Sequence, residues 1–134
     1  MPRRLLSLAA VLAAGLLLPS AASGTTYCVS KQACVDAGGV DKGTDLQAAL
    51  DDAADDDPFR SRVEIGPGTF ARPGGYTYFG NAPVDIVGSG RGGGGTFIHP
   101  PPIGTGEIST ALFVSPTGPA TVSDLAIVMA DATG

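Results

Sequence analysis

Three glycines in the middle of the chain have the spacing of a phosphate-binding turn. Gly88, Gly90 and Gly93 form G-x-G-x-x-G directly after the apolar segment Val84 to Val87, where a dinucleotide-binding turn would lie. In such a turn, the N-terminus of the next helix supplies the N–H groups and the positive dipole that hold a pyrophosphate. The chemistry therefore depends on the segment that follows.

That segment predicts a strand and not a helix. The glycines continue to Gly95 and into the β-branched and aromatic residues Thr96 to His99, and three prolines follow. Glu107 lies about where a ribose-binding acid would be sought, but its surroundings, PIGTGEIST, indicate a loop. We therefore interpret the region as strand, glycine turn and strand, and we predict no cofactor.

The other charged residues offer material for catalysis but no recognisable spacing. A hydrolase of polysaccharides needs two carboxylates facing one groove, and a lyase needs an Arg or Lys base beside a cation site. Arg91 lies among glycines that would let a ligand approach closely. The isolated carboxylates are Asp85, Glu107, Asp124 and Asp131. Catalytic residues stay unassigned, and whether the protein is an enzyme stays open.

Three further groups each have an ordinary and a functional interpretation. The lone His99 completes neither a zinc site nor a Ser-His-Asp triad, because further ligands and a nucleophile elbow are missing. Tyr76, Tyr78 and Phe79 favour packing over a platform for a sugar ring. The acidic run DDAADDD favours a solvated helix face; calcium is the alternative, and no motif supports it.

The N-terminal residues follow the order of regions found in a secretory signal peptide, which we assign to residues 1–24. Arg3 and Arg4 precede an apolar run from Leu5 to Leu18, and small residues follow. Cleavage is expected after Ala22 or Gly24, with an uncleaved anchor as the alternative. We expect an exported, extracellular protein with no membrane segment after cleavage.

The net charge of the exported chain, residues 25–134, limits the classes of partner that it can bind. Without Arg3 and Arg4, six basic residues face thirteen acidic ones, a net charge of about −7. This balance argues against nucleic acid, which demands a basic surface, and against strongly anionic substrates unless a cation is bound. The two cysteines, Cys28 and Cys34, predict a small disulfide loop that ties down the N-terminal strand. The oligomeric state is not predicted.

A helix is expected after Gly43. Thr44 is the predicted N-cap and Gln47 completes a T-x-x-Q capping box. The helix should end near Asp57, because Pro58 follows. Its apolar face consists of Leu46, Ala49, Leu50, Ala53 and Ala54.

Short strands separated by glycine and proline follow the helix. In the last one, ATVSDLAIVM, inward positions change phase between Val122 and Leu125, which predicts a corner at Ser123 and Asp124. In this pattern Val63, Val84 and Val122 begin comparable strands, which favours an irregular parallel β-solenoid. The predicted strands are Arg62–Ile65, Thr69–Ala71, Tyr76–Phe79, Val84–Val87, Thr96–His99, Ala111–Val114 and Ala120–Met129.

This order of elements resembles the N-terminal part of secreted right-handed parallel β-helix proteins of the pectate-lyase-like group. The resemblance covers roughly Asp45 to Asp131 and rests on GTDLQAALDDA, on Gly66-Pro67-Gly68-Thr69-Phe70 and on Val87-Gly88-Ser89-Gly90-Arg91-Gly92. It departs from the family at the glycine before Pro67 and in the longer glycine run.

The resemblance implies a mainly β fold: the start of a right-handed parallel β-helix with an N-terminal capping α-helix, incomplete after about two coils. It implies a structural role for Arg91. The family's catalytic residues lie on later coils, so none carries over to this sequence. We expect residues 25–134 to belong to a protein that binds or cleaves extracellular polysaccharide. The alternatives are a non-enzymatic surface or adhesion module and a truncated product without activity.

Overall fold

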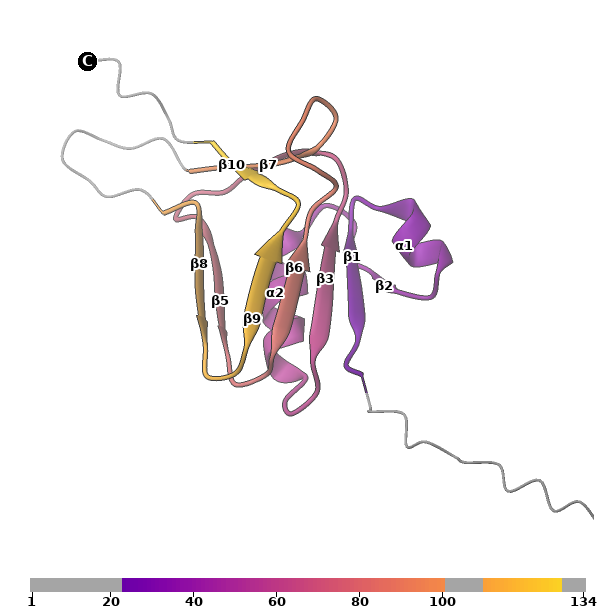
Figure 1. Ribbon diagram of the computed structural model, residues 1–134, viewed down its shortest axis with the longest axis vertical. Helices are drawn as coiled ribbons and strands as arrows, with labels where there is room; N and C mark the ends of the chain where they lie inside the picture. The colour runs from indigo at the N-terminus through magenta and orange to yellow at the C-terminus, as the bar shows by residue number, and fades with distance from the viewer. Residues whose placement is uncertain (1–22, 101–109, 129–134) are drawn as a thin grey trace, which may run out of the picture.

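Strands make up most of the regular structure, and all strand pairings between the described residues are parallel. The computed structural model describes residues 23–100 and 110–128 (Figure 1). Its strands are β1 (Thr26–Val29), β2 (Val40–Asp41), β3 (Ser61–Ile65), β4 (Gly68–Ala71), β5 (Tyr76–Gly80), β6 (Val84–Val87), β7 (Thr96–His99), β8 (Leu112–Pro116), β9 (Ala120–Ser123) and β10 (Ala126–Ile127). The helices are α1 (Gln32–Asp36) and α2 (Leu46–Asp55).

The strands form three parallel sheets, which the chain visits in a fixed order. The sheets are ordered β2-β1-β3-β6-β9, β10-β7-β4 and β5-β8. After β3, β4 and β5, the strands β6, β7 and β8 pair with them in the same order. β9 and β10 then pair with β6 and β7. Each pass of the chain therefore places its strands beside those of the pass before.

The strand register corrects one sequence-based expectation. Val63 pairs with Ile86, and Ile86 pairs with Val122, whereas Val84 pairs with Ser61. The predicted equivalence of Val63 and Val84 is wrong, because β3 begins two residues before Val63, at Ser61. The bounds of β6 and β7 are those predicted, and β8 begins one residue later than predicted.

The core lies between the three sheets and is filled by every second residue of their strands. Val63, Ile86, Tyr78 and Ile98 are fully buried, and they come from all three sheets. Burying a side chain of this size stabilises a fold by roughly 1.5–3 kcal/mol. The alternation of buried and partly exposed residues along β6 and β7 fixes which face of each strand is turned outward.

Helix α2 covers one end of this core. It packs against β1, β3 and β5 and lies behind the strands in Figure 1. Its predicted apolar face is confirmed, because Leu46, Ala49, Leu50 and Ala53 are buried. The helix ends at Asp55, shortly before Pro58, as expected.

The predicted cap of α2 is wrong by one residue. Asp45 is the N-cap, and its Oδ1 accepts a hydrogen bond from the backbone N–H of Ala48 at 3.0 Å. A carboxylate at this position satisfies an orphan N–H and also faces the positive end of the helix dipole. Gln47, expected to complete a capping box with Thr44, is buried and binds β5 instead.

The N-terminal part of the described chain adds one helix and two strands before α2. β1 lies between β2 and β3. Cys28 on β1 and Cys34 on α1 are paired as a disulfide, as the sequence led us to expect. The pair fastens α1 to the outer side of β1. Residues 1–22, which hold most of the predicted signal peptide, lie outside the described residues.

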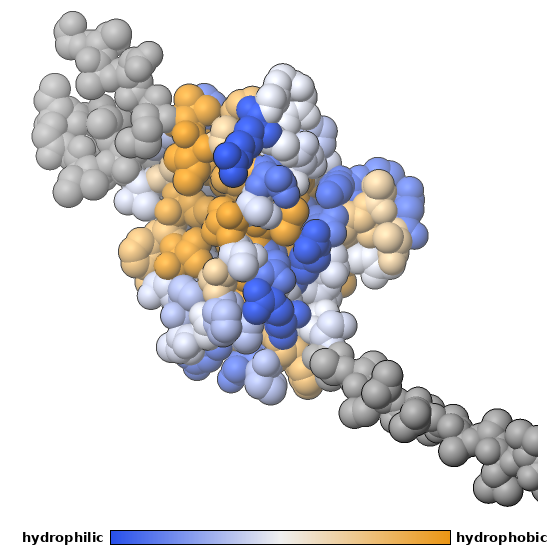
Figure 2. Space-filling model, in the orientation of Figure 1, coloured by the Kyte–Doolittle hydropathy of each residue, from blue (hydrophilic) through white to orange (hydrophobic). Residues whose placement is uncertain are grey.

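The end of the core opposite α2 carries apolar side chains at the surface. The predicted corner is confirmed: Asp124, with φ of 55°, separates β9 from β10. Val122 and Ile127 pair with the buried Ile86 and Ile98, yet they are 44% and 47% exposed. Figure 2 shows apolar side chains gathered over β8, β9 and β10. In the parts of the chain that the structure describes, no helix is long and apolar enough to cross a membrane.

Candidate functional site

The glycine motif is a turn between two strands, as predicted. It joins β6 directly to β7, and the N–H of Thr96 donates to the carbonyl of Gly90 at 2.9 Å. Gly88 allows a close approach, because a Cβ there would lie 2.2 Å from the carbonyl oxygen of Asp124. These glycines therefore let the next pass of the chain lie close to the turn.

The candidate residues that the structure describes do not gather at one site. Arg91 is exposed in the glycine turn, His99 lies half-buried on β7, and Asp124 forms the corner after β9. Glu107 and Asp131 lie outside the described residues. Of the two candidate carboxylates that the structure describes, Asp85 and Asp124, Asp85 has the more developed surroundings.

Asp85 is held on the outer face of β6 by two neighbours. Arg60 donates two hydrogen bonds to its carboxylate, from Nε at 2.8 Å and from an Nη at 2.6 Å. Thr121 Oγ1 on β9 donates a third at 2.5 Å. The hydrogen bonds from Arg60 lower the pKa of Asp85 to about 2, from the usual 3.8. Asp85 is therefore ionised across the whole physiological pH range.

Glu64 on β3 lies in a second cluster of opposite charges. Lys31 Nζ, at the start of α1, lies 2.8 Å from one carboxylate oxygen, and Arg62 Nε lies 2.8 Å from the other. The hydrogen bond from Lys31, followed by that from Arg62, lowers the pKa of Glu64. This carboxylate is also ionised near neutral pH.

Asp85 from the first cluster and Arg62 from the second belong to one row of polar side chains across the outer face of the five-stranded sheet. Thr26 pairs with Arg62, Arg62 with Asp85, and Asp85 with Thr121. Neighbouring strands lie about 4.8 Å apart, so the row runs across four strands at right angles to them. We call it the polar row. The sequence signal for it was the alternation of polar residues with buried ones along each strand.

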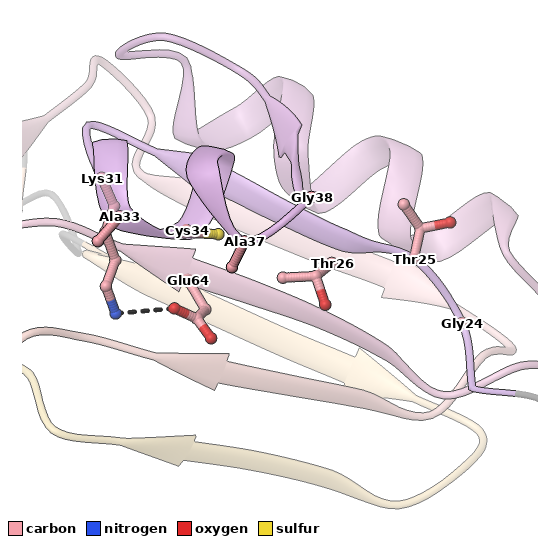
Figure 3. Close-up of a pocket in the computed structure, with 10 residues that line it drawn as sticks. Gly24, Thr25, Thr26, Lys31, Ala33, Cys34, Ala37, Gly38 and Glu64 are labelled. Atoms are coloured by element: carbon pink, nitrogen blue, oxygen red, sulfur yellow. Dashed lines mark ion pairs between the residues drawn. The ribbon is translucent and has the colours of Figure 1, made fainter.

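A groove of about 460 Å³ lies at the β1 end of the polar row. Figure 3 shows α1 over β1, with Lys31 directed across to Glu64 and with Thr26 and Ala37 facing the same groove. Gly39 lets the chain after α1 lie close to the disulfide, because a Cβ there would lie 2.2 Å from Cys28 Sγ. The disulfide loop therefore forms one wall, and the outer face of the sheet forms the floor.

These carboxylates suit binding better than acid catalysis. A general acid works best when its pKa lies near the working pH, which for a carboxyl group requires a raised value. The pKa values of Asp85 and Glu64 are both lowered. Each can accept hydrogen bonds, but neither holds a proton that it could donate near neutral pH.

The acidic run of α2 is divided among separate structural contacts. Asp51 accepts from Gln47, Asp52 pairs with Lys42, and Asp56 Oδ2 accepts from Ser61 Oγ at 2.5 Å. Tyr27 and the backbone N–H of Thr25 also donate to Asp56, each at 3.2 Å. Over residues 23–100 and 110–128, no three potential ligands gather as a metal site would require.

The three aromatics that offered a platform divide between core and surface. Tyr76 and Tyr78 are buried, and the Tyr78 hydroxyl donates to the carbonyl of Ala82 at 2.7 Å. Packing is therefore confirmed for these two. Phe79 is 64% exposed and lies beside Phe113, which sequence reasoning had not singled out. The chain matches no protein-family model, no curated protein and no solved structure.

Proposed function

We propose that this chain is the capped beginning of an exported right-handed parallel β-helix. The repeated visit to three parallel sheets in one order supports this architecture. The position of α2 across one end of the core supports its role as the cap. The half-exposed Val122 and Ile127 at the other end support the stacking of a further coil there, since each extends a column of buried residues.

We further propose that the outer face of the five-stranded sheet binds an extracellular polysaccharide of neutral sugars. The polar row is the observation that carries this proposal, because it sets guanidinium, carboxylate and hydroxyl groups in a line across the strands. Such groups bond the hydroxyls of an extended sugar chain as both donors and acceptors. The negative net charge disfavours an acidic polysaccharide.

Binding without cleavage fits the row better than hydrolysis does. Asp85 in the polar row and Glu64 beside it are both ionised near neutral pH, so neither can act as the general acid that hydrolysis requires. A surface or adhesion module that recognises no sugar is the rival function. It is favoured by the extent to which Arg60 and Asp85 already satisfy one another.

The proposal is tested with the full chain, expressed for export, on a panel of neutral and acidic polysaccharides. Arg60→Ala and Thr121→Ala should weaken retention on the neutral members, whereas Arg91→Ala, which removes another exposed arginine, in the glycine turn, should not. Unsaturated products or new reducing ends would contradict binding without cleavage. A wild-type chain that is retained on no polysaccharide, but that folds, would overturn the proposal.

A further inference from the structure

Two phenylalanines form an exposed pair on a face away from the polar row. They project from the outer side of the β5–β8 sheet, where Phe79 is 64% exposed and Phe113 is 45% exposed. Phe79 pairs in register with Ser115, and Phe113 pairs with Thr77, so the two rings are diagonal neighbours. Their centroids lie 5.2 Å apart, with the ring planes tilted by 42°.

Packing in the described core does not account for the exposed positions of these two rings. Neither ring belongs to the buried core cluster. β5 contributes Tyr76 and Tyr78 to that cluster, and the alternate residues Leu112 and Val114 of β8 are partly buried against it. A mutual contact between two aromatic rings contributes about 0.5–1.5 kcal/mol. That contact leaves most of the Phe79 ring exposed to water.

A hollow of about 430 Å³ borders Phe79. Its other walls are the last turn of α2 and the turns that follow β5 and β8. Gly80 forms part of it, and a Cβ at that position would lie 2.8 Å from the Cβ of Ala54. The volume falls within the roughly 300–1,000 Å³ of small-molecule sites.

The hollow offers hydrogen-bonding groups of both kinds. Thr117 Oγ1 donates to Asn81 Oδ1 at 3.2 Å, and no described residue accepts a hydrogen bond from the Asn81 amide nitrogen. The Asp55 carboxylate and the Ser115 hydroxyl line the same hollow and have no side-chain hydrogen bond to any other described residue. Donors and acceptors therefore surround one edge of an exposed ring.

An aromatic face beside such groups has the chemistry of a sugar site. The face of a phenyl ring is electron-rich and attracts the weakly positive C–H groups of a pyranose ring. The hydroxyls of the same sugar can bond to the amide, the hydroxyl and the carboxylate. Asp55 disfavours a uronic acid in this position by repelling its charge.

We propose that Phe79 and Phe113, with Asn81 and Asp55, form a second binding site for one neutral hexose or pentose unit. The ligand class rests on the proposed function, but the site is separate from the polar row. The test is titration of the full chain with cellohexaose, xylohexaose and mannohexaose, with an oligogalacturonate as the acidic probe. Binding is followed by NMR and by calorimetry.

Phe79→Ala and Asn81→Ala should each weaken binding of the neutral probe by roughly five- to tenfold, the loss expected for one aromatic contact or one hydrogen bond. Phe59→Ala is the matched control, because Phe59 is 45% exposed like Phe113 but lies before β3. It should bind as the wild type does. Circular dichroism checks that each variant folds.

The outcomes separate this site from the polar row. Binding that survives Phe79→Ala and is lost in Arg60→Ala overturns the second site and leaves the proposed function standing. Binding lost in Phe79→Ala and kept in Arg60→Ala supports the second site and contradicts the polar row. An oligogalacturonate that binds as well as the neutral probes, or a chain that binds none of them, overturns the second site.

Discussion

The side chain of Gln47 pairs with the backbone of Thr77 as a neighbouring strand would. Its amide nitrogen donates to the Thr77 carbonyl at 2.7 Å, and its amide oxygen accepts from the Thr77 N–H at 2.9 Å. β5 pairs with β8 on one side, so Gln47 satisfies backbone groups on the other side. A helix residue thus covers part of a strand edge whose backbone groups would otherwise be free to pair with a strand of another chain.

Gln47→Ala should therefore destabilise the protein by about 2–3 kcal/mol, because it leaves a donor and an acceptor of Thr77 without partners beside a packed helix. Urea unfolding measures the loss. The control is Gln32→Ala on α1, where the Gln32 side chain bonds no described residue but the exposed Asp36, and it should cost less than about 0.5 kcal/mol. Equal losses in the two variants would contradict this role of Gln47.

The cap of α2 gives a second prediction. Asp45→Ala removes the acceptor of the Ala48 N–H and should cost about 1 kcal/mol. Thr44→Ala should cost little, because Thr44 is exposed and its side chain makes no hydrogen bond to a described residue. Thermal and urea denaturation of the two variants distinguish the positions. A larger loss of stability in Thr44→Ala than in Asp45→Ala would contradict the role of Asp45 and favour the capping box predicted from the sequence.

The glycine turn gives a third. Gly88→Ala places a methyl group against the Asp124 carbonyl at 2.2 Å and should cost about 1–3 kcal/mol. At Gly93 a Cβ meets no atom within 4 Å, so Gly93→Ala should change stability by less than about 0.5 kcal/mol. The comparison is made by urea unfolding, and similar losses at both positions would show that the close approach at Gly88 is unimportant.

Acid should weaken the fold through Asp85. Its pKa is lower in the folded chain than its usual 3.8, so its contribution is present above about pH 4 and is lost as the pH falls toward 2. Asp85→Asn and Arg60→Ala should both make stability less dependent on pH in that range. Urea midpoints at pH 7, 4, 3 and 2 measure the effect. A variant with the wild-type dependence would contradict the pairing.

Local patterns in the sequence predicted the elements that depend on local physics. The apolar spacing of α2, the bounds of β6 and β7 and the corner at Asp124 follow from residues near one another. The hydrogen bonds of Gln47 could not be predicted in this way, because their partner, Thr77, lies thirty residues away in the sequence. The polar row could not be predicted either, because only the strand register shows that Arg62, Asp85 and Thr121 are neighbours.

The turns between passes differ in length while the register of the strands stays constant. Two residues join β3 to β4, and eight join β6 to β7, yet Gly68 still pairs with Thr96. Position in the stack is therefore set by backbone pairing and buried side chains, and not by counting along the chain. Insertions at the exposed residues Gly92 and Gly93 would lengthen a surface loop at little entropic cost. Such a chain can diversify its turns without disturbing the core, and its sequence then has no fixed spacing that would reveal which strands pair.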